Sequence, residues 1–193
     1  MLLSACTTTT IVPPASVDRP QSVFVLDHGR HSSIVLPHPE GFVRYAYGDW
    51  GWYAEVETGP TEAIRAAFWP TRAGLGRSLT AGTATREGVR GGLRVGIQEI
   101  HEVPVETDRV DALRSSLEAL HRENYASVKY NTVYDLAFVE HPEPYAFWHN
   151  SNHKVAEWLR QLGCAIEGNA LWASWQVQPR ALATEGVKDL GGD

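Results

Sequence analysis

The sequence predicts an α+β fold, in which an antiparallel sheet packs against helices. Three β-rich runs lie close together over residues 22–27, 31–36 and 42–47, with short turns between them. Two later stretches, 107–122 and 152–162, repeat their apolar residues with the period of a helix. We therefore expect a sheet of about four to six strands with the helix over 152–162 packed against it.

The first part of the chain supplies most of the expected sheet. Residues 22–27 read Ser-Val-Phe-Val-Leu-Asp, and Gly29 provides a turn before the run at 31–36, which the prolines that follow are expected to end. Residues 42–47 alternate apolar and polar side chains, as a half-buried strand does. Residues 48–53 are expected to form a turn that is rich in aromatic side chains.

The middle of the chain has weaker patterns. A short helix is predicted over Thr61 to Phe68, because Thr61 is a suitable N-cap and a proline follows the last turn. Residues 71–92 contain many Gly, Thr and Arg residues and are predicted to be mostly loop. Alternation over 93–105 predicts another strand, and Pro104 indicates a sheet edge because proline has no N–H for a ladder.

Two amphipathic helices follow. The first covers 107–122 and places its apolar residues on one face. Residues 131–138 are predicted to be a loop leading into a short helix, and the His-Pro-Glu-Pro run at 141–144 is expected to break the chain direction. The second amphipathic helix covers 152–162, and Gly163 is a suitable C-terminal stop.

Composition excludes several classes of function. The formal net charge is −6 and no long basic run is present, which disfavours nucleic-acid binding. No stretch approaches the length of about 18 apolar residues that a membrane-spanning helix needs. Two cysteines, Cys6 and Cys164, are too few for a disulfide framework or a cysteine-rich zinc site, and Cys164 is expected to be a small buried apolar residue.

The chain is expected to form a single α+β domain over residues 21–183. Residues 1–20 are predicted to be a leader remnant and a disordered tether, and residues 184–193 a flexible tail. The run Leu-Ser-Ala-Cys that ends at Cys6 resembles the lipobox of bacterial lipoproteins, in which the cysteine carries the lipid. Only five residues precede Cys6, fewer than a complete signal peptide needs.

One pair of segments, far apart in sequence, is suited to nucleophilic catalysis. Ser151 lies at the start of the predicted helix 152–162, where free N–H groups and the helix dipole favour a developing anion. His31 begins a strand and is the candidate base, and Asp49 is the candidate partner that would fix its tautomer. Asn150 and Asn152 could add side-chain donors to an oxyanion hole.

Other interpretations of these residues remain open. Ser151 is also a suitable helix N-cap, His31 an ordinary polar residue at a strand start, and Asp49 a turn former. A metal hydrolase is a further alternative, because His28-x-x-His31 and His149-x-x-x-His153 have metal-ligand spacing and Asp49 could complete a site. The abundant aromatic residues are suited to a ligand cleft or to core packing.

Three segments together carry a family resemblance that covers most of residues 22–178. They are residues 28–32 (His-Gly-Arg-His-Ser), 47–53 (Tyr-Gly-Asp-Trp-Gly-Trp-Tyr), and 150–153 (Asn-Ser-Asn-His) with the helix that follows. This pattern resembles a family of uncharacterised bacterial lipoproteins. That family looks like a branch of the circularly permuted papain-like hydrolases, the group that includes relatives of lecithin:retinol acyltransferase.

The resemblance implies a permuted papain-like arrangement with a histidine on an early strand, a polar partner on the next strand and a nucleophilic cysteine at a later helix start. These positions correspond to His31, Asp49 and Ser151, so a serine stands where the permuted hydrolases have cysteine. A serine hydroxyl ionises far less readily than a thiol and depends on base catalysis. The serine marks a serine-using variant, a non-catalytic protein, or an engineered inactive nucleophile.

The resemblance further implies an envelope-anchored hydrolase or acyltransferase-like protein that acts on amide or ester bonds of cell-envelope peptides or acyl groups. His28 and Trp50 are additional candidates for substrate binding. No cofactor is expected, and the membrane would be reached through a lipid on Cys6, on the periplasmic side. The alternative is a non-catalytic envelope lipoprotein that binds a ligand in the same cleft.

Overall fold

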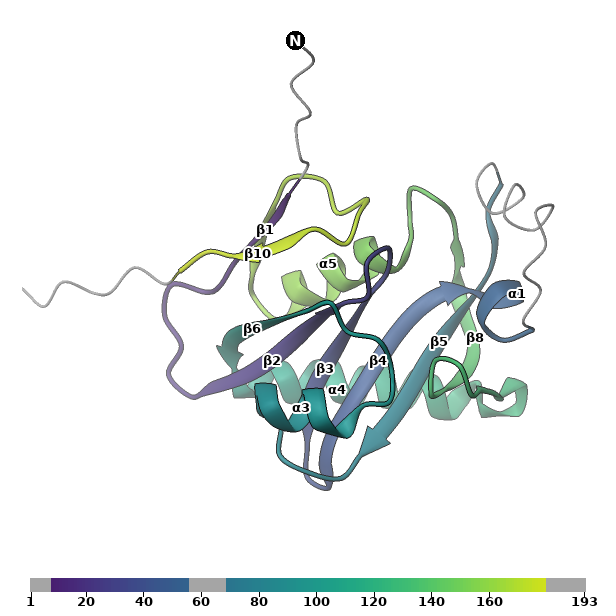
Figure 1. Ribbon diagram of the computed structural model, residues 1–193, viewed down its shortest axis with the longest axis horizontal. Helices are drawn as coiled ribbons and strands as arrows, with labels where there is room; N and C mark the ends of the chain where they lie inside the picture. Colours follow the sequence, from purple (N-terminus) through teal and green to yellow (C-terminus); the bar gives the residue numbers. More distant parts are fainter. Residues whose placement is uncertain (1–7, 56–68, 180–193) are drawn as a thin grey trace, which may run out of the picture.

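A computed structural model describes residues 8–55 and 69–179 of the 193-residue chain. It has the predicted α+β architecture, with a large antiparallel sheet and helices on both of its faces (Figure 1). The helix expected over 61–68, the proposed lipidation site Cys6 and the polar tail from residue 184 lie outside the described residues. No helix in the described part of the chain is long and apolar enough to span a membrane.

The large sheet has seven strands in the order β6-β2-β3-β4-β5-β8-β7, and every neighbouring pair is antiparallel. It is therefore larger than the predicted sheet. The three early strands are confirmed, and β6 lies at an edge, as Pro104 indicated. The strands are β2 (Pro20–Asp27), β3 (Ser32–His38), β4 (Gly41–Asp49), β5 (Thr71–Thr80), β6 (Glu99–Glu106), β7 (Lys129–Asn131) and β8 (Leu136–Tyr145).

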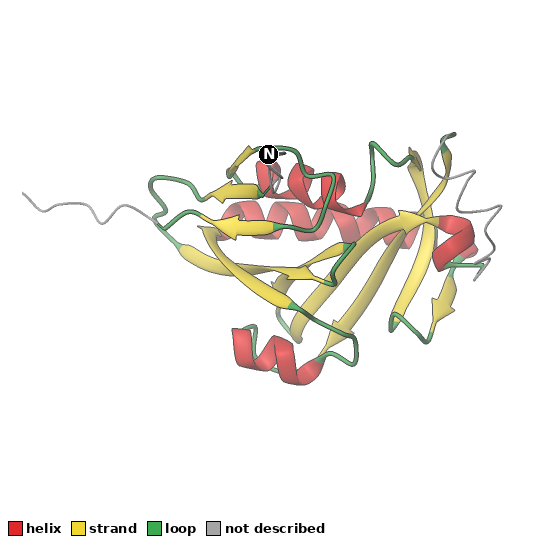
Figure 2. Cartoon of the chain, turned by 45° about the horizontal axis from the view of Figure 1, so that its top comes forward, coloured by secondary structure: helices red, strands yellow, loops and turns green. Residues whose placement is uncertain are grey.

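Helices cover the two faces of this sheet unequally (Figure 2). The long helices α4 (Thr107–Glu123) and α5 (Ser151–Gln161) lie on one face, and the short α3 (Arg86–Gly92) lies on the other. Both predicted amphipathic helices are thus confirmed. A one-turn helix, α1 (Trp50–Tyr53), follows β4, and a 3₁₀ turn, η1 (Tyr125–Ser127), follows α4.

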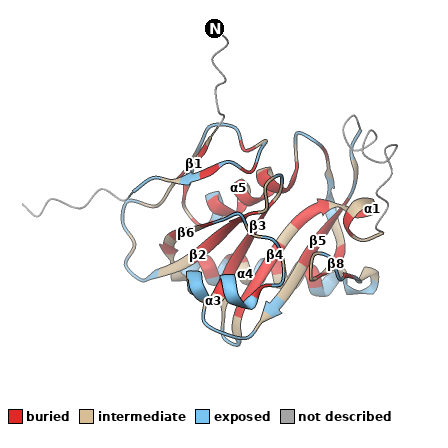
Figure 3. Cartoon of the chain, in the orientation of Figure 1, coloured by how far each residue is buried: buried red, intermediate tan, exposed pale blue. Residues whose placement is uncertain are grey.

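Strand alternation explains why there are two cores. Along β2, Val23 and Val25 pack with the α4 and α5 helices, whereas Phe24 and Leu26 pack with Val89 of α3. Successive side chains of a strand point to opposite faces, so a strand that is apolar at every position must be covered on both sides. Figure 3 shows the central strands buried between these layers.

Residues 9–12 belong to the folded domain, which corrects the predicted tether. They form β1 (Thr9–Val12), which pairs in parallel with β10 (Trp175–Val177) and antiparallel with β9 (Ala165–Glu167). Ile11 is fully buried in the larger core. The β-branched residues of this segment therefore form a partly buried strand, although the Thr- and Pro-rich sequence around them suggested disorder.

The predicted loop over 71–92 is wrong, because β5 is an inner strand of the sheet and α3 follows it. Gly74 and Gly76 of β5 do not form turns; their lack of a side chain leaves room for neighbouring aromatic rings. A Cβ added at Gly76 would lie 2.7 Å from the Phe138 ring, and one at Gly74 would lie 3.2 Å from both Phe138 and Trp50. Glycine at these positions lets aromatic rings lie directly on the strand.

The predicted loop and helix over 131–138, and the break at 141–144, are wrong as well. Strand β8 runs from Leu136 through both prolines to Tyr145. Its outer neighbour β7 pairs only with residues 136–138, so on that side the prolines of β8 have no strand partner among the described residues. Proline is tolerated at such edge positions. The strand predicted over 93–105 likewise begins only at Glu99.

Candidate functional site

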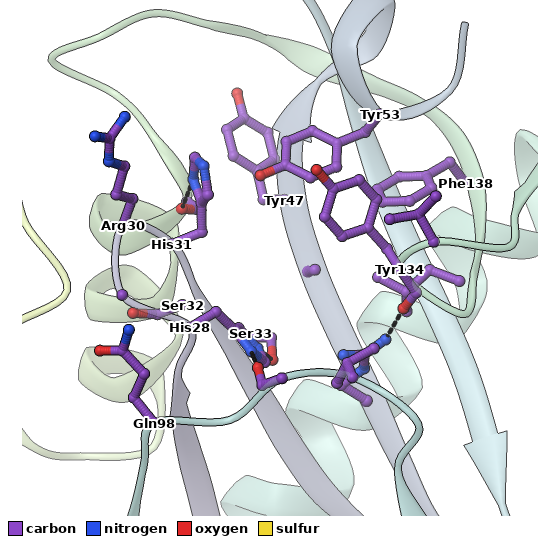
Figure 4. A pocket seen from close by; sticks show the side chains of 18 residues that line it. His28, Arg30, His31, Ser32, Ser33, Tyr47, Tyr53, Gln98, Tyr134 and Phe138 are labelled. Atoms are coloured by element: carbon purple, nitrogen blue, oxygen red, sulfur yellow. Dashed lines mark hydrogen bonds between the residues drawn. The ribbon is translucent and has the colours of Figure 1, made fainter. Parts of the chain in front are cut away.

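The structure brings the two separated segments together at one end of the sheet. Ser151, the first residue of α5, and His31, which precedes β3, are 120 residues apart in sequence, and Ser151 Oγ lies 3.4 Å from His31 Nδ1. Both residues line a cavity of about 570 Å³ (Figure 4). A hydroxyl and an imidazole at this distance can form the nucleophile and base of a hydrolytic site.

His31 has an environment that favours the neutral imidazole. Burial lowers its pKa below the ordinary value, and the nearby His28 and Arg30 lower the pKa further. The edge of its ring meets Tyr53, with the ring centroids 5.7 Å apart. A neutral ring that carries its proton on Nε2 leaves Nδ1 free to accept the Ser151 proton.

Ser151 is not the N-cap of its helix, because Asn150 has that role. Asn150 Oδ1 accepts hydrogen bonds from the backbone N–H groups of Asn152 at 2.9 Å and His153 at 3.2 Å. The N–H of Ser151 makes no hydrogen bond within the described chain. The capping interpretation of Ser151 is therefore wrong, and its own N–H is the candidate oxyanion donor.

The expected oxyanion role of the two amide side chains is not supported by their contacts. Asn150 Nδ2 donates to the carbonyl oxygens of Phe147 and Leu171. Asn152 is fully buried, and its Nδ2 donates to the carbonyl oxygens of Arg30 and Leu171, each at 3.2 Å. Asn152 therefore ties the start of α5 to the residue before His31 and acts as a positioning residue.

Replacing Asn152 is expected to destabilise the protein. Asn152→Ala leaves the Arg30 carbonyl without this donor and removes one of the two donors to the Leu171 carbonyl, and we expect a loss of about 2 kcal/mol in the free energy of unfolding. Asn152→Asp places a carboxylate against the same carbonyls and should cost more than about 3 kcal/mol. Urea unfolding measures both changes. Asn124→Ala, which removes one bond to the Leu120 carbonyl, is the control and should cost about 1 kcal/mol.

Asp49 does not orient His31 in this structure. One carboxylate oxygen caps α1 by accepting the Trp52 N–H at 2.8 Å, and the other accepts the Thr71 hydroxyl. No hydrogen bond joins Asp49 to His31 among the described residues. The turn-forming interpretation of Asp49 describes its contacts better than the triad interpretation does, because both of its carboxylate oxygens accept hydrogen bonds from groups other than His31.

A second serine–histidine pair lies in the same cavity. His28 Nδ1 donates to the Gly96 carbonyl at 2.7 Å, and its Nε2 lies 2.9 Å from Ser33 Oγ. Burial lowers the His28 pKa. Ser33 lies inside a strand, where no helix N-terminus can stabilise an oxyanion, so this pair is a poorer catalytic candidate than Ser151 with His31.

Aromatic side chains make one wall of the cavity (Figure 4). The Tyr53 ring packs against Tyr134 and Phe138, with centroid separations of 4.7 and 5.6 Å. The sequence singled out Trp50 instead, but Trp50 is buried in the core beneath this wall and does not line the cavity. The aromatic run at 48–53 does contribute a ring to the cavity, but the sequence could not show that this ring is Tyr53 and not Trp50.

The metal-binding alternative is not supported by the positions of its residues. Both ring nitrogens of His28 have protein partners, and His153 Nδ1 lies 3.1 Å from Asn150 Oδ1. Within residues 8–55 and 69–179, the group of potential ligands that converges is Glu143, His149 and Glu157. Those residues already surround the ammonium of Lys154.

The cation is the ammonium of Lys154, which is 4% exposed and lies one turn after Ser151. Its Nζ contacts Glu143 and lies 2.6 Å from Glu157, and it sits 5.2 Å from the centre of the Tyr47 ring. His149 Nε2 is 3.0 Å from the same glutamate, Glu157. This network holds the loop before α5 against the helix, so it is suited to fixing the position of Ser151.

Breaking this network should be costly. Lys154→Met removes the charge between two carboxylates, and we expect the free energy of unfolding to fall by about 2–3 kcal/mol. This is the lower end of the range for buried ion pairs, because Glu143 and Glu157 are partly exposed. The control is Lys129→Met, whose partner Glu55 also accepts from Arg72; this exposed pair should cost less than about 1 kcal/mol. Equal effects of the two variants in urea unfolding would contradict the structural role of Lys154.

Comparison with known proteins gives no relative for this chain: no family model, no curated protein and no solved structure matches it.

Proposed function

We propose that this protein is a hydrolase or acyltransferase that acts on amide or ester bonds, with Ser151 as nucleophile and His31 as base. The observation that carries the proposal is the 3.4 Å approach of Ser151 Oγ to His31 Nδ1 in a cavity large enough for a small substrate. The lowered pKa of His31 supports it, because a base must be unprotonated to accept a proton near neutral pH.

In the proposed reaction, Ser151 Oγ attacks the substrate carbonyl while His31 Nδ1 takes the hydroxyl proton. The developing oxyanion accepts a hydrogen bond from the Ser151 N–H at the positive end of the α5 dipole. His31 then returns the proton to the departing amine or alcohol, and an acyl group stays on Ser151. Water, or an acceptor alcohol in the acyltransferase case, releases that acyl group by the same steps in reverse.

We also propose that the fold is a permuted papain-like arrangement and that the protein is anchored in the bacterial envelope. The order of elements supports the first part, since His31 lies between β2 and β3, early in the sheet, and the nucleophile follows at a later helix start. The Leu-Ser-Ala-Cys run at Cys6 supports a lipid anchor facing the periplasm. Peptides or acyl groups of envelope material are then the substrate class, by analogy with the resembled family.

A fluorophosphonate probe, which phosphonylates activated serines with loss of fluoride, tests this proposal on the folded protein. We expect the wild type to be labelled at Ser151 and Ser151→Ala to be unlabelled. His31→Ala should react at least about 100-fold more slowly, because the general base is lost. Gel fluorescence over time measures the rates.

The same experiment separates the two serine–histidine pairs. Labelling that persists in Ser151→Ala but is lost in Ser33→Ala would assign the nucleophile to the Ser33–His28 pair and overturn the proposal. A wild-type protein that no probe labels, but that binds ligands in the cavity, would instead match the non-catalytic alternative.

A further inference from the structure

One buried cation in the cavity forms no salt bridge with the described residues. Arg44 lies on β4 and is 2% exposed, yet it lines the same cavity as Ser151 and His31. A buried guanidinium is normally paired with a carboxylate, because desolvating an unpaired charge is expensive. The salt bridges of the described chain include none to Arg44.

The hydrogen bonds of Arg44 satisfy only part of its guanidinium. Nη2 donates to the backbone carbonyls of Tyr134 and Asp135, the first bond being the dashed line at Tyr134 in Figure 4. Nε is buried without a hydrogen-bond partner in the described chain. The carboxylate that acts on the Arg44 charge, Asp135, accepts a hydrogen bond from the Tyr130 hydroxyl with Oδ1 and makes no salt bridge to Arg44 among the described residues.

Electrostatics support this view of an uncompensated charge. Burial lowers the pKa of Arg44 to about 10, although Asp135 and Tyr130 act in the opposite direction. The guanidinium also lowers the pKa of His28, so the two groups lie close together in the cavity. The described residues that line the cavity include Arg30, Arg44, His28 and His31 but no Asp or Glu, in a protein whose net charge is −6.

The position of Arg44 relative to the nucleophile sets the shape of a ligand. In the β3–β4 pairing, Ser33 faces Ala46. His31 lies two residues before Ser33 and Arg44 lies two residues before Ala46, a separation of about 13 Å along the sheet at 3.3 Å per residue. Between these two points lies the apolar wall of Tyr53, Tyr134 and Phe138.

We propose that the cavity takes an acyl group with an apolar body and a terminal carboxylate, which Arg44 binds at the end away from Ser151. The inference rests on the proposed function for the orientation of the acyl group, but not for the binding itself. A singly charged carboxylate suits the site better than a doubly charged phosphate, since Arg44 is the buried arginine among the described residues of the cavity lining and its Nη2 already donates to two carbonyls. Arg30, the other arginine, is exposed at the cavity mouth.

Binding to the Ser151→Ala variant tests this without catalysis. Octanoate, octanamide and octyl phosphate are titrated by calorimetry. We expect octanoate to bind at least about tenfold more tightly than octanamide, which corresponds to one charge-assisted hydrogen bond. Octyl phosphate binding more tightly than octanoate through Arg44 would overturn the assignment to a carboxylate.

Variants and a direct spectroscopic readout locate the carboxylate. Arg44→Met should remove the preference for octanoate over octanamide, Arg44→Lys should keep part of it, and the exposed Arg122→Gln on α4 is the matched control without effect. Because Arg44→Met also loses its bonds to the Tyr134 turn, the Arg44 Nε–H resonance is followed in Ser151→Ala with Arg44 intact. A shift of that resonance on adding octanoate, and not octanamide, is expected. An unchanged resonance, or equal binding of the two ligands, would overturn the inference, whereas a failed fluorophosphonate experiment would not.

Discussion

The Ser151→Cys variant is expected to react with iodoacetamide at neutral pH at least about tenfold faster than an ordinary exposed thiol, because a helix N-terminus and a neighbouring imidazole lower the pKa of a cysteine. The 3.4 Å contact with His31 Nδ1 places the new thiol beside that imidazole. Adding His31→Ala should remove the enhancement. Mass spectrometry of the labelled residue measures the rate.

The chain offers matched controls for this experiment. Ser33→Cys places a thiol in the same cavity, 2.9 Å from His28 Nε2 in the parent structure, but within a strand and away from any helix N-terminus. It should react more slowly than Ser151→Cys. Burial raises the pKa of Cys164 to about 12, so that residue should not react with iodoacetamide. Cys6 is replaced by serine in every variant.

Together with the serine probe, the cysteine variant distinguishes the explanations for Ser151. Reaction of both wild type and variant with their probes indicates a serine-using enzyme. Reaction of the cysteine variant alone indicates a site whose nucleophile has been lost, by divergence or by substitution. If Ser151→Cys reacts no faster than Ser33→Cys, no papain-like site exists here.

The second large expected effect is a loss of stability in mild acid. Burial is the first cause of a lowered pKa at six histidines in the described chain: His28, His31, His101, His121, His141 and His153. In the unfolded chain each of them binds a proton near pH 6.5. In the folded protein each binds its proton only at lower pH.

The unfolded state therefore binds more protons as the pH falls below about 6.5, and the free energy of unfolding decreases with pH there. Each such histidine contributes up to about 1.4 kcal/mol per pH unit until its folded pKa is reached. We expect a loss of more than about 1 kcal/mol between pH 7.5 and 5.5, above the range in which most carboxylates titrate. Urea unfolding at a series of pH values measures the slope.

A single substitution tests whether buried histidines cause this slope. His121 is buried on α4, and its Nε2 hydrogen bonds to the Ala137 carbonyl at 3.1 Å. In His121→Gln an amide N–H can replace that donor without a titrating group. The variant should show a smaller pH slope, by up to one proton. A wild-type stability that stays flat from pH 7.5 to 5.5 would contradict the prediction.

Prediction from sequence succeeded where local periodicity records burial. Strands β2, β3 and β4 and the helices α4 and α5 were identified because alternation and helical spacing follow directly from which side chains face the core. It failed at β5 and β8, where glycines and prolines are normally signals for loops. In β5 the missing side chains make room for Phe138, and in β8 the prolines fall on a free edge, and neither reason is local.

The sequence by itself determined the α+β class and the pairing of a histidine before a strand with a serine at a helix start. Only the tertiary structure decided what surrounds that pair. Asn152 positions the site because its partner, the Arg30 carbonyl, is 122 residues away, and Asp49 is a cap because Thr71 and Trp52 occupy its oxygens. Arg44 reads as an ordinary polar residue of an alternating strand, and its unpaired charge becomes evident only when the sheet, the aromatic wall and the turn at Tyr134 enclose it. Polar groups are defined by their partners, and those partners come from parts of the chain that local sequence patterns do not connect.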